Sequence, residues 1–211
     1  MPSSQPASRD VPVTYLDANR LWVDSRVRYE IGLRVEGRLL ARLGARGARC
    51  VEIGTGRRGL GSRAAVRYLG AEEVLAFDLH PASVGRAAIA TADLRDRVDV
   101  RVGDATALPV PDASADLVLS FHALHHIVDW RAAVAEAARV VRPGGQVALT
   151  EMTSRFVDAP WLRAVSRHPA DRFDTRQLVE ELRRCGLEVR DGDLTSRVGG
   201  RWVQAVAHRT T

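Results

Sequence analysis

Two spacings of apolar residues alternate along the chain. Short, nearly continuous apolar runs predict strands at residues 49–53, 73–78, 115–120 and 146–151, and alternation of valine with polar residues predicts a strand near a sheet edge at 98–102. Between them apolar residues recur at helical spacing, which predicts helices over 61–69 and 81–92 and a third helix that Asp129 caps. Strands that alternate with helices in this way indicate an α/β domain with a mostly parallel sheet and helices on both of its faces.

The pattern before the first strand is different. Residues 1–11 are polar and rich in proline and serine, which predicts a disordered tail. From about residue 13 to residue 43 the spacing is helical. An apolar residue recurs there every four positions, at Ile31, Val35, Leu39 and Leu43, with Leu40 beside them. These residues form one apolar stripe, of the kind that faces a protein core.

The C-terminal segment predicts one helix and two strands. Asp174 with Gln177 three positions later resembles a capping box, and Gly186 is a good helix terminator. Strands follow at about 187–191 and 201–207. The connection between them is too short for a crossover helix, so we expect an antiparallel hairpin and seven strands in all.

The first strand runs into a glycine-rich turn and then a helix. Glu52 stands just before Gly54, and Gly56 and Gly59 follow. Glycines let the backbone turn sharply and let a ligand approach without a Cβ in the way. A strand–turn–helix unit of this kind holds a nucleotide-like ligand at the carboxyl end of a parallel sheet. The same glycine spacing also fits a dinucleotide fingerprint, so a nicotinamide-dependent oxidoreductase stays open as an alternative.

Composition narrows the choice of partners and compartment. The net charge is +5, and all 31 basic residues are arginine, but the 26 acidic residues are interleaved with them, which does not favour a nucleic-acid partner. Cys50 and Cys185 lie in apolar patterns, so we expect buried thiols and a reducing cytoplasm. No apolar run approaches the length of a membrane span, and no membrane association is expected.

Four blocks together resemble the class I S-adenosylmethionine-dependent methyltransferases, in particular the small-molecule "type 11" group. The blocks are VEIGTGRRGLG, VLAFDLH, GDATALPVPDASADLVLSFHALHHI and ARVVRPGGQVALTE, and they cover roughly residues 48–151. The resemblance implies a Rossmann-like sheet of seven strands in the order 3-2-1-4-5-7-6, with strand 7 antiparallel. It also implies a donor-binding domain over 48–211, with helices over 12–47 on the substrate side.

The resemblance places the donor, S-adenosylmethionine, over the glycine turn. Gly54, Thr55 and Gly56 would pass close to its methionine part, where a side chain would collide. Glu52 would hold the donor's ammonium through a water. Asp78 would accept hydrogen bonds from both ribose hydroxyls.

Further donor contacts are implied after the second, third and fourth strands. Leu79 and Ala105 would sandwich the adenine, and Asp104 would accept from its exocyclic amine. Ser120 and Phe121, which end the fourth strand, would complete the site. The pair Arg57-Arg58 departs from the family's usual Gly-x-Gly-x-Gly turn, and it would pair with the donor's carboxylate or point to solvent.

Three histidines follow the fourth strand. His122 and His126 would share a face if that segment were helical, but the glutamate of a zinc-protease helix is absent, so no metal site is expected. His125 and His126 match a recurrent family turn, which suggests a structural role. His122 lies where the donor's sulfur should face the acceptor, and it is the candidate general base.

The hypothesis that follows is an enzyme that moves a methyl group to a small molecule by in-line displacement. A base is needed only if the acceptor arrives protonated, as a hydroxyl would. The residues leave open whether oxygen, nitrogen, carbon or sulfur receives the methyl group, and they do not fix the oligomeric state. A protein that binds the donor but has lost catalysis is a further alternative.

Overall fold

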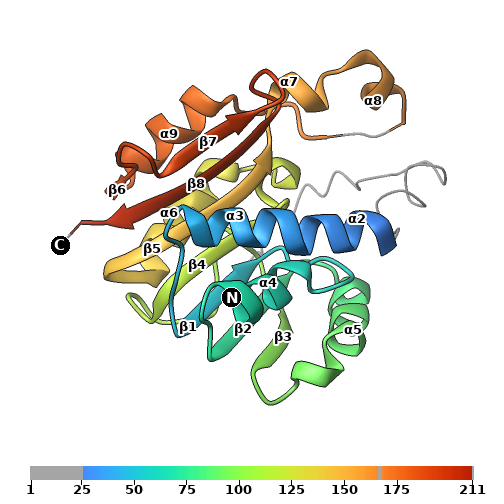
Figure 1. The fold of residues 1–211 in the computed structure, drawn as a ribbon, viewed down its shortest axis with the longest axis vertical. Coiled ribbons are helices and arrows are strands. Elements are labelled where there is room, and N and C mark those ends of the chain that lie inside the picture. The colour runs from blue at the N-terminus through green and yellow to red at the C-terminus, as the bar shows by residue number, and fades with distance from the viewer. Residues whose placement is uncertain (1–25, 166–167, 211) are drawn as a thin grey trace, which may run out of the picture.

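A single mixed sheet forms the centre of the molecule in a computed structural model that describes residues 26–165 and 168–210. The strand order is β3-β2-β1-β4-β5-β8-β6, and β7 pairs with β8 beside this path (Figure 1). Strands β1 to β5 are parallel, and β8 is antiparallel to β5, β6 and β7. The strands are β1 Arg49–Ile53, β2 Glu73–Asp78, β3 Val98–Val102, β4 Ala115–Phe121, β5 Val141–Met152, β6 Leu187–Glu188, β7 Leu194–Arg197 and β8 Trp202–Arg209.

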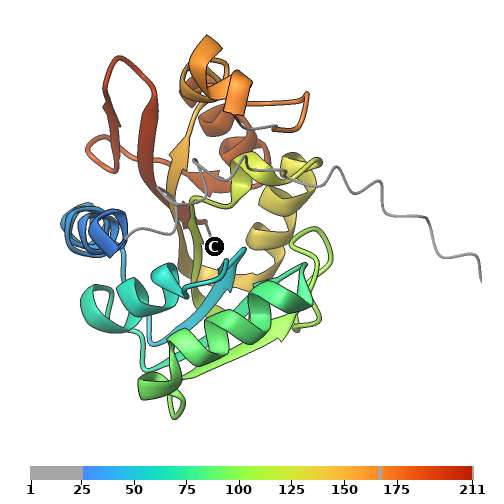
Figure 2. The same cartoon turned by 90° about the vertical axis from the view of Figure 1, so that its right-hand side faces the viewer.

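Helices cover both faces of this sheet (Figure 2). The α-helices are α2 Arg26–Ile31, α3 Gly37–Arg42, α4 Leu60–Tyr68, α5 Pro81–Ala90, α6 Trp130–Val140, α7 Ser154–Val157, α8 Pro160–Val165 and α9 Thr175–Arg184. A π-helical turn, η1 (Gly32–Glu36), joins α2 to α3, and two short 3-10 turns are η2 (Ala92–Leu94) and η3 (Leu124–His126). Within the described part of the chain, no helix has both the length and the apolar character needed to cross a bilayer.

Strand β4 separates the two halves of the core. Leu117 and Leu119 pack with α3 and α4 on one face, and Val118 packs with α6 and α9 on the other. Successive side chains of a strand point to opposite faces, so a strand that is buried on both faces must be apolar throughout. The nearly continuous apolar run at 115–120 therefore predicted this strand correctly, and the sheet order from β3 to β5 is the one that the family resemblance implies.

The predicted helix caps are present. The Asp129 side chain accepts a hydrogen bond from the amide of Ala132 at 3.0 Å, which begins α6. The capping box is reciprocal, because the Asp174 carboxylate accepts from the amide of Gln177 at 2.8 Å and the Gln177 side chain accepts from the amide of Asp174 at 2.9 Å. These side chains satisfy amides that have no partner inside the helix.

The C-terminal hairpin differs from the prediction in two respects. The strand expected at 187–191 is only two residues long, Leu187–Glu188. An additional strand, β7, comes between β6 and β8 along the chain. The sequence pattern missed β7 because all four of its residues are half-buried or exposed, so no apolar signal marks them. The fifth strand also begins five residues early, at Val141, where a register shift against β4 accommodates Pro143 to Gly145.

The predicted buried stripe of the N-terminal helix is confirmed at Leu40 and wrong at Ile31 and Val35. Ile31 is 54% exposed and Val35 is 49% exposed, whereas Leu33 and Leu40 are buried. The buried residues Leu33, Gly37 and Leu40 are spaced i, i+4 and i+7 and share one helical face, whereas a strict spacing of four drifts by about 40° around an α-helix at each step. The predictions for residues 1–11 and for the first part of the 13–43 helix lie outside the described residues.

Two matched substitutions distinguish the buried part of the predicted stripe from its exposed part. Leu40→Ala should lower the free energy of unfolding by about 2–5 kcal/mol, because a fully buried leucine leaves a cavity. Val35→Ala should change it by no more than about 0.5 kcal/mol, since that side chain is half-exposed. Urea unfolding of both variants measures the difference. An equal loss of unfolding free energy in the two variants would contradict the difference in burial between Leu40 and Val35.

Candidate active site

The glycine-rich turn follows β1 at the carboxyl edge of the sheet. Gly54 and Gly56 have φ angles of 68° and 63°, a region that side chains rarely adopt. A Cβ on Gly54 would lie 2.3 Å from the Cβ of Ala123, whereas a Cβ on Gly56 would meet nothing within 4 Å. The turn is therefore packed against the protein at its first glycine and open at its second. An open glycine backbone suits a ligand that passes close to the main chain.

Asp78, the last residue of β2, is tied to this turn. One carboxylate oxygen accepts a hydrogen bond from the amide of Gly56 at 2.9 Å, and the other accepts from the amide of His80 at 2.9 Å. The carboxylate is half-buried, and each of its oxygens has a further lone pair for a ligand's hydroxyl groups. Both contacts hold the carboxylate beside the open part of the turn.

The residues predicted to bind adenine lie at the ends of two neighbouring parallel strands. Asp78 is opposite Val102 in the register of β2 and β3, so the loops that follow both strands emerge at the same edge. Leu79 is 44% exposed, an unusual position for a large apolar side chain. Asp104 accepts from the amide and the hydroxyl of Thr106 at 2.8 and 2.7 Å. Ala105 packs at the margin of the core. Leu79 and Asp104 thus follow neighbouring strands at one edge of the sheet.

Glu52 lies beneath the glycine turn. It is 1% exposed, and its carboxylate accepts hydrogen bonds from the hydroxyls of Thr55, at 3.0 Å, and Ser62. A Cβ at Gly61 would lie 2.1 Å from a Glu52 oxygen, so that position must be glycine. Burial raises the pKa of Glu52 to about 7. Glu52 thus supports the turn from below, and Thr55, predicted as a donor contact, points its hydroxyl at Glu52.

The end of β4 is organised by Glu151, which sequence reasoning did not single out. Ser120 is fully buried and donates to the Glu151 carboxylate at 2.5 Å, and the amides of Ala123 and Leu124 donate to the same oxygen at 3.2 and 3.0 Å. His125 Nδ1 contacts its other oxygen at 2.7 Å. Burial raises the pKa of Glu151. Its signal in the sequence is an acidic residue that ends an apolar strand.

Phe121, the other predicted contact from β4, is 6% exposed and packs in the core on the α3 side of the sheet. Its side chain and that of Ser120 therefore face the protein interior.

His122 follows β4 and pairs with a residue from the N-terminal helix. Its Nε2 lies 2.8 Å from a carboxylate oxygen of Glu36, the last residue of η1, and the two side chains are 10% and 20% exposed. The backbone of His122 has a φ angle of 60°. A histidine in this left-handed region costs about 1–3 kcal/mol and persists only where its surroundings impose it, which is common at active sites. Sequence reasoning missed Glu36 because its partner is distant along the chain.

His125 and His126 occupy η3, and the ring of His168 lies against both. The ring centroids of His126 and His168 are 5.0 Å apart and nearly parallel, and those of His125 and His126 are 4.1 Å apart. Burial lowers the pKa of His126 well below its ordinary value and lowers that of His168. His122 and His126 share no helical face. His122 itself has left-handed backbone geometry, and only the single 3-10 turn that contains His126 follows it.

Arginines gather on the outer side of the N-terminal helix. The guanidinium of Arg58, in the glycine turn, lies over the ring of Tyr29 at 5.7 Å, a cation–π contact that neither sequence alternative foresaw.

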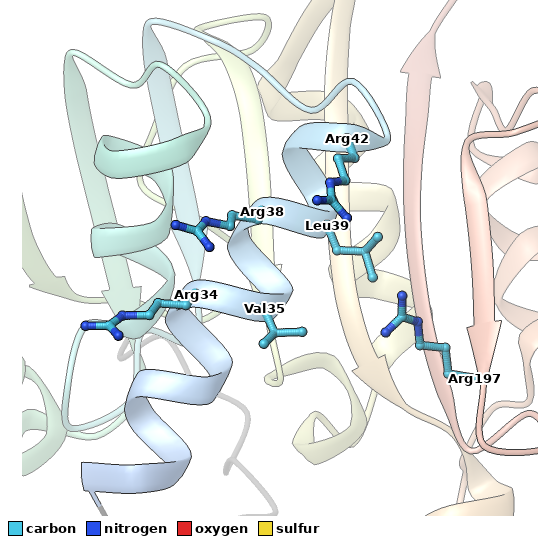
Figure 3. Close-up of a pocket in the computed structure, with 6 residues that line it drawn as sticks. All are labelled: Arg34, Val35, Arg38, Leu39, Arg42 and Arg197. Carbon is cyan, nitrogen blue, oxygen red and sulfur yellow. The ribbon is translucent and has the colours of Figure 1, made fainter.

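A separate groove of about 250 Å³ lies between the N-terminal helix and β7 (Figure 3). Its lining residues are Arg34, Val35, Arg38, Leu39, Arg42 and Arg197. Since the glycine turn, Asp78 and His122 line no part of it, we place the active site at the strand ends.

Comparison with known proteins agrees with this geometry. The sequence model of a methyltransferase domain family matches residues 51–149. The chain is 32% identical over 197 residues to 27-O-demethylrifamycin SV methyltransferase of Amycolatopsis mediterranei, covering 87% of this chain and 71% of that protein. It is 32% identical over 123 residues to phthiotriol/phenolphthiotriol dimycocerosates methyltransferase of Mycobacterium tuberculosis, covering 54% of this chain and 46% of that protein.

A solved methyltransferase structure shares the fold of this chain. A SAM-dependent methyltransferase of Aquifex aeolicus superposes with a TM-score of 0.71 at 18% identity, covering 93% of this chain and all of that one (100%). Sheet order, glycine turn and the acidic end of β2 define a class I methyltransferase domain. The chain belongs to the S-adenosylmethionine-dependent methyltransferases, although it spans only about half the length of the mycobacterial relative. The comparisons give no support to a nicotinamide-dependent oxidoreductase.

The buried carboxyl of Glu52 predicts a pH-dependent stability. Its pKa is about 7 in the folded protein and about 4.3 in an unfolded chain, so the folded state holds the proton more tightly. This contribution is complete below about pH 4.3 and is lost as pH rises through about 7, by roughly 4 kcal/mol. Glu52→Gln has no titrating group there and should lack this part of the slope. Urea unfolding of both proteins between pH 5 and 8 tests the difference, and parallel pH profiles would refute it.

Proposed function

We propose that the protein transfers a methyl group from S-adenosylmethionine to a hydroxyl group of a small molecule. The pairing of His122 with Glu36 at the carboxyl end of β4 carries this proposal, because it is the arrangement of a general base held by a carboxylate. The name of the Amycolatopsis relative describes an O-methyltransferase of a small molecule, which supports the same acceptor class. Two free cysteines, one of them fully buried, are in keeping with the reducing cytoplasm that we propose as its compartment.

The residues at the strand ends fit the donor. The open space at Gly56 admits the methionine part, Asp78 offers carboxylate oxygens to the ribose, and the exposed side chain of Leu79 offers an apolar surface to the adenine. Asp104 and Ala105 would complete the adenine site. Glu52, buried under the turn, would reach the donor's ammonium only through an intervening group such as a water. When bound, the donor supplies a methyl group on a positively charged sulfur.

His122 would take the proton of the acceptor hydroxyl. A carboxylate of Glu36 that accepts a hydrogen bond from Nε2 favours the tautomer in which Nδ1, which is buried and has no hydrogen-bond partner among the described residues, is the proton acceptor. The same carboxylate would stabilise the imidazolium that forms. Alignment of acceptor and donor and exclusion of water supply the rest of the catalysis. We propose that α2, η1, residues 156–165 and His168 border the acceptor, and that this face of the domain binds no nucleic acid.

Asp78→Ala should weaken donor binding. Loss of a charge-assisted hydrogen bond to the ribose corresponds to about 1.5–3 kcal/mol. The matched control is Asp99→Ala, because Asp99 is an exposed aspartate on β3 that pairs only with Arg101 among the described residues. Calorimetric titration with S-adenosylmethionine or its demethylated product measures both variants. Equal affinity of Asp78→Ala and Asp99→Ala would show that the ribose lies elsewhere.

His122→Ala should lower kcat by about 10²–10⁴-fold and leave donor affinity nearly unchanged. The loss should shrink at high pH, where a hydroxyl acceptor ionises unaided. Glu36→Gln keeps the size of the partner but removes its charge, so its rate should fall between those of the parent and His122→Ala. If His122 only lines the pocket, its substitution should raise the KM for the acceptor and leave the pH profile unchanged.

A further inference from the structure

Three imidazoles from two distant segments meet beside η3. His125 and His126 come from η3 itself, and His168 comes from the segment after α8. One ring nitrogen from each lies within 4.8 Å of the other two. The centre of such a triangle is at most about 2.8 Å from each nitrogen, and a zinc–imidazole bond is about 2.0–2.1 Å long. Ligation would therefore require each nitrogen to move inward by less than about 1 Å and, because the rings of His126 and His168 are stacked, one of these rings to turn so that its in-plane lone pair points at the ion.

The orientation of His125 matches that of a metal ligand. Its Nδ1 lies 2.7 Å from a carboxylate oxygen of Glu151, and neither side chain is more than 2% exposed. Ligating histidines almost always donate their second ring nitrogen to a carboxylate or a carbonyl, which sets the tautomer and aims the ring. Glu151 is held in turn by Ser120 and by the amides of Ala123 and Leu124. A carboxylate this firmly placed would fix Nε2 of His125 as the ligating atom.

We propose that His125, His126 and His168 bind one late first-row transition metal ion, such as Zn²⁺. Imidazole ligands suit zinc, copper and nickel, whereas magnesium and calcium prefer oxygen. Three protein ligands leave a coordination position open for water or for an oxygen atom of a small molecule. The His122 and His125 ring centroids are 6.4 Å apart, so the ion would lie near the proposed base. The His122 and His126 pair weighed from sequence is a different set, because folding brings in His168.

Metal binding is measured on the untagged full chain after treatment with a chelator, and without S-adenosylmethionine. Calorimetric titration with ZnCl₂ should give one site per chain, and addition of Co²⁺ should give the visible absorption of a low-symmetry imidazole site. His168→Ala should weaken Zn²⁺ binding at least tenfold. His80→Ala, which removes an exposed histidine outside the cluster, should bind as the parent does. Because no donor is present, failure here and failure of methyl transfer remain separate results.

Two further measurements separate ligation from folding. Zn²⁺ should raise the Tm of the parent and of His80→Ala but not that of His168→Ala, while the metal-free Tm of all three proteins should agree. Glu151→Gln, checked for native structure by circular dichroism, should weaken Zn²⁺ binding about 10–100-fold. The proposal is overturned if the parent takes up no stoichiometric Zn²⁺, if His168→Ala binds as tightly as the parent, or if His80→Ala loses as much affinity.

Discussion

The buried carboxylate of Glu151 is the contact on which the rest of the candidate active site depends. It accepts hydrogen bonds from Ser120 and from the amides of Ala123 and Leu124, and it pairs with His125. These contacts hold the loop after β4 in one conformation. Removing the carboxylate would leave several buried donors without an acceptor, at about 1–3 kcal/mol for each. A carboxylate at this depth is tolerable only because so many donors surround it.

The effect of Glu151 reaches the donor side through a packing contact. The amide of Ala123 donates a hydrogen bond to Glu151. Gly54 packs against the same residue so closely that a Cβ on Gly54 would lie 2.3 Å from the Cβ of Ala123. The glycine turn therefore rests on the same loop that carries His122. Glu52 supports that turn from below through Thr55 and Ser62. Two buried acids thus hold both sides of the site rigid before a ligand arrives, which is how binding geometry becomes preorganised.

The sequence predicted the elements whose signal is local. Strand β4 follows from a continuous apolar run, and the caps at Asp129 and Asp174 follow from the chemistry of helix ends. Strand β7 has no such signal, because none of its side chains is buried. Contacts between residues that are distant along the chain could not be predicted from the sequence either. Nothing near His126 points to His168, and nothing near His122 points to Glu36.

The exposed part of the predicted helix stripe and the missed partner of His122 lie in the same turn. A stripe of residues spaced strictly by four drifts around an α-helix, which turns about 100° per residue. Val35 lies in the π-helical turn Gly32–Glu36 and is half-exposed, at the groove lined by arginines (Figure 3). The same turn ends at Glu36, which reaches His122 at 2.8 Å. π-Helical turns are rare and gather at functional sites, because an extra residue redirects a side chain at a cost in hydrogen bonding. The turn that carries the exposed Val35 is therefore also the turn through which the N-terminal helix meets the proposed catalytic base.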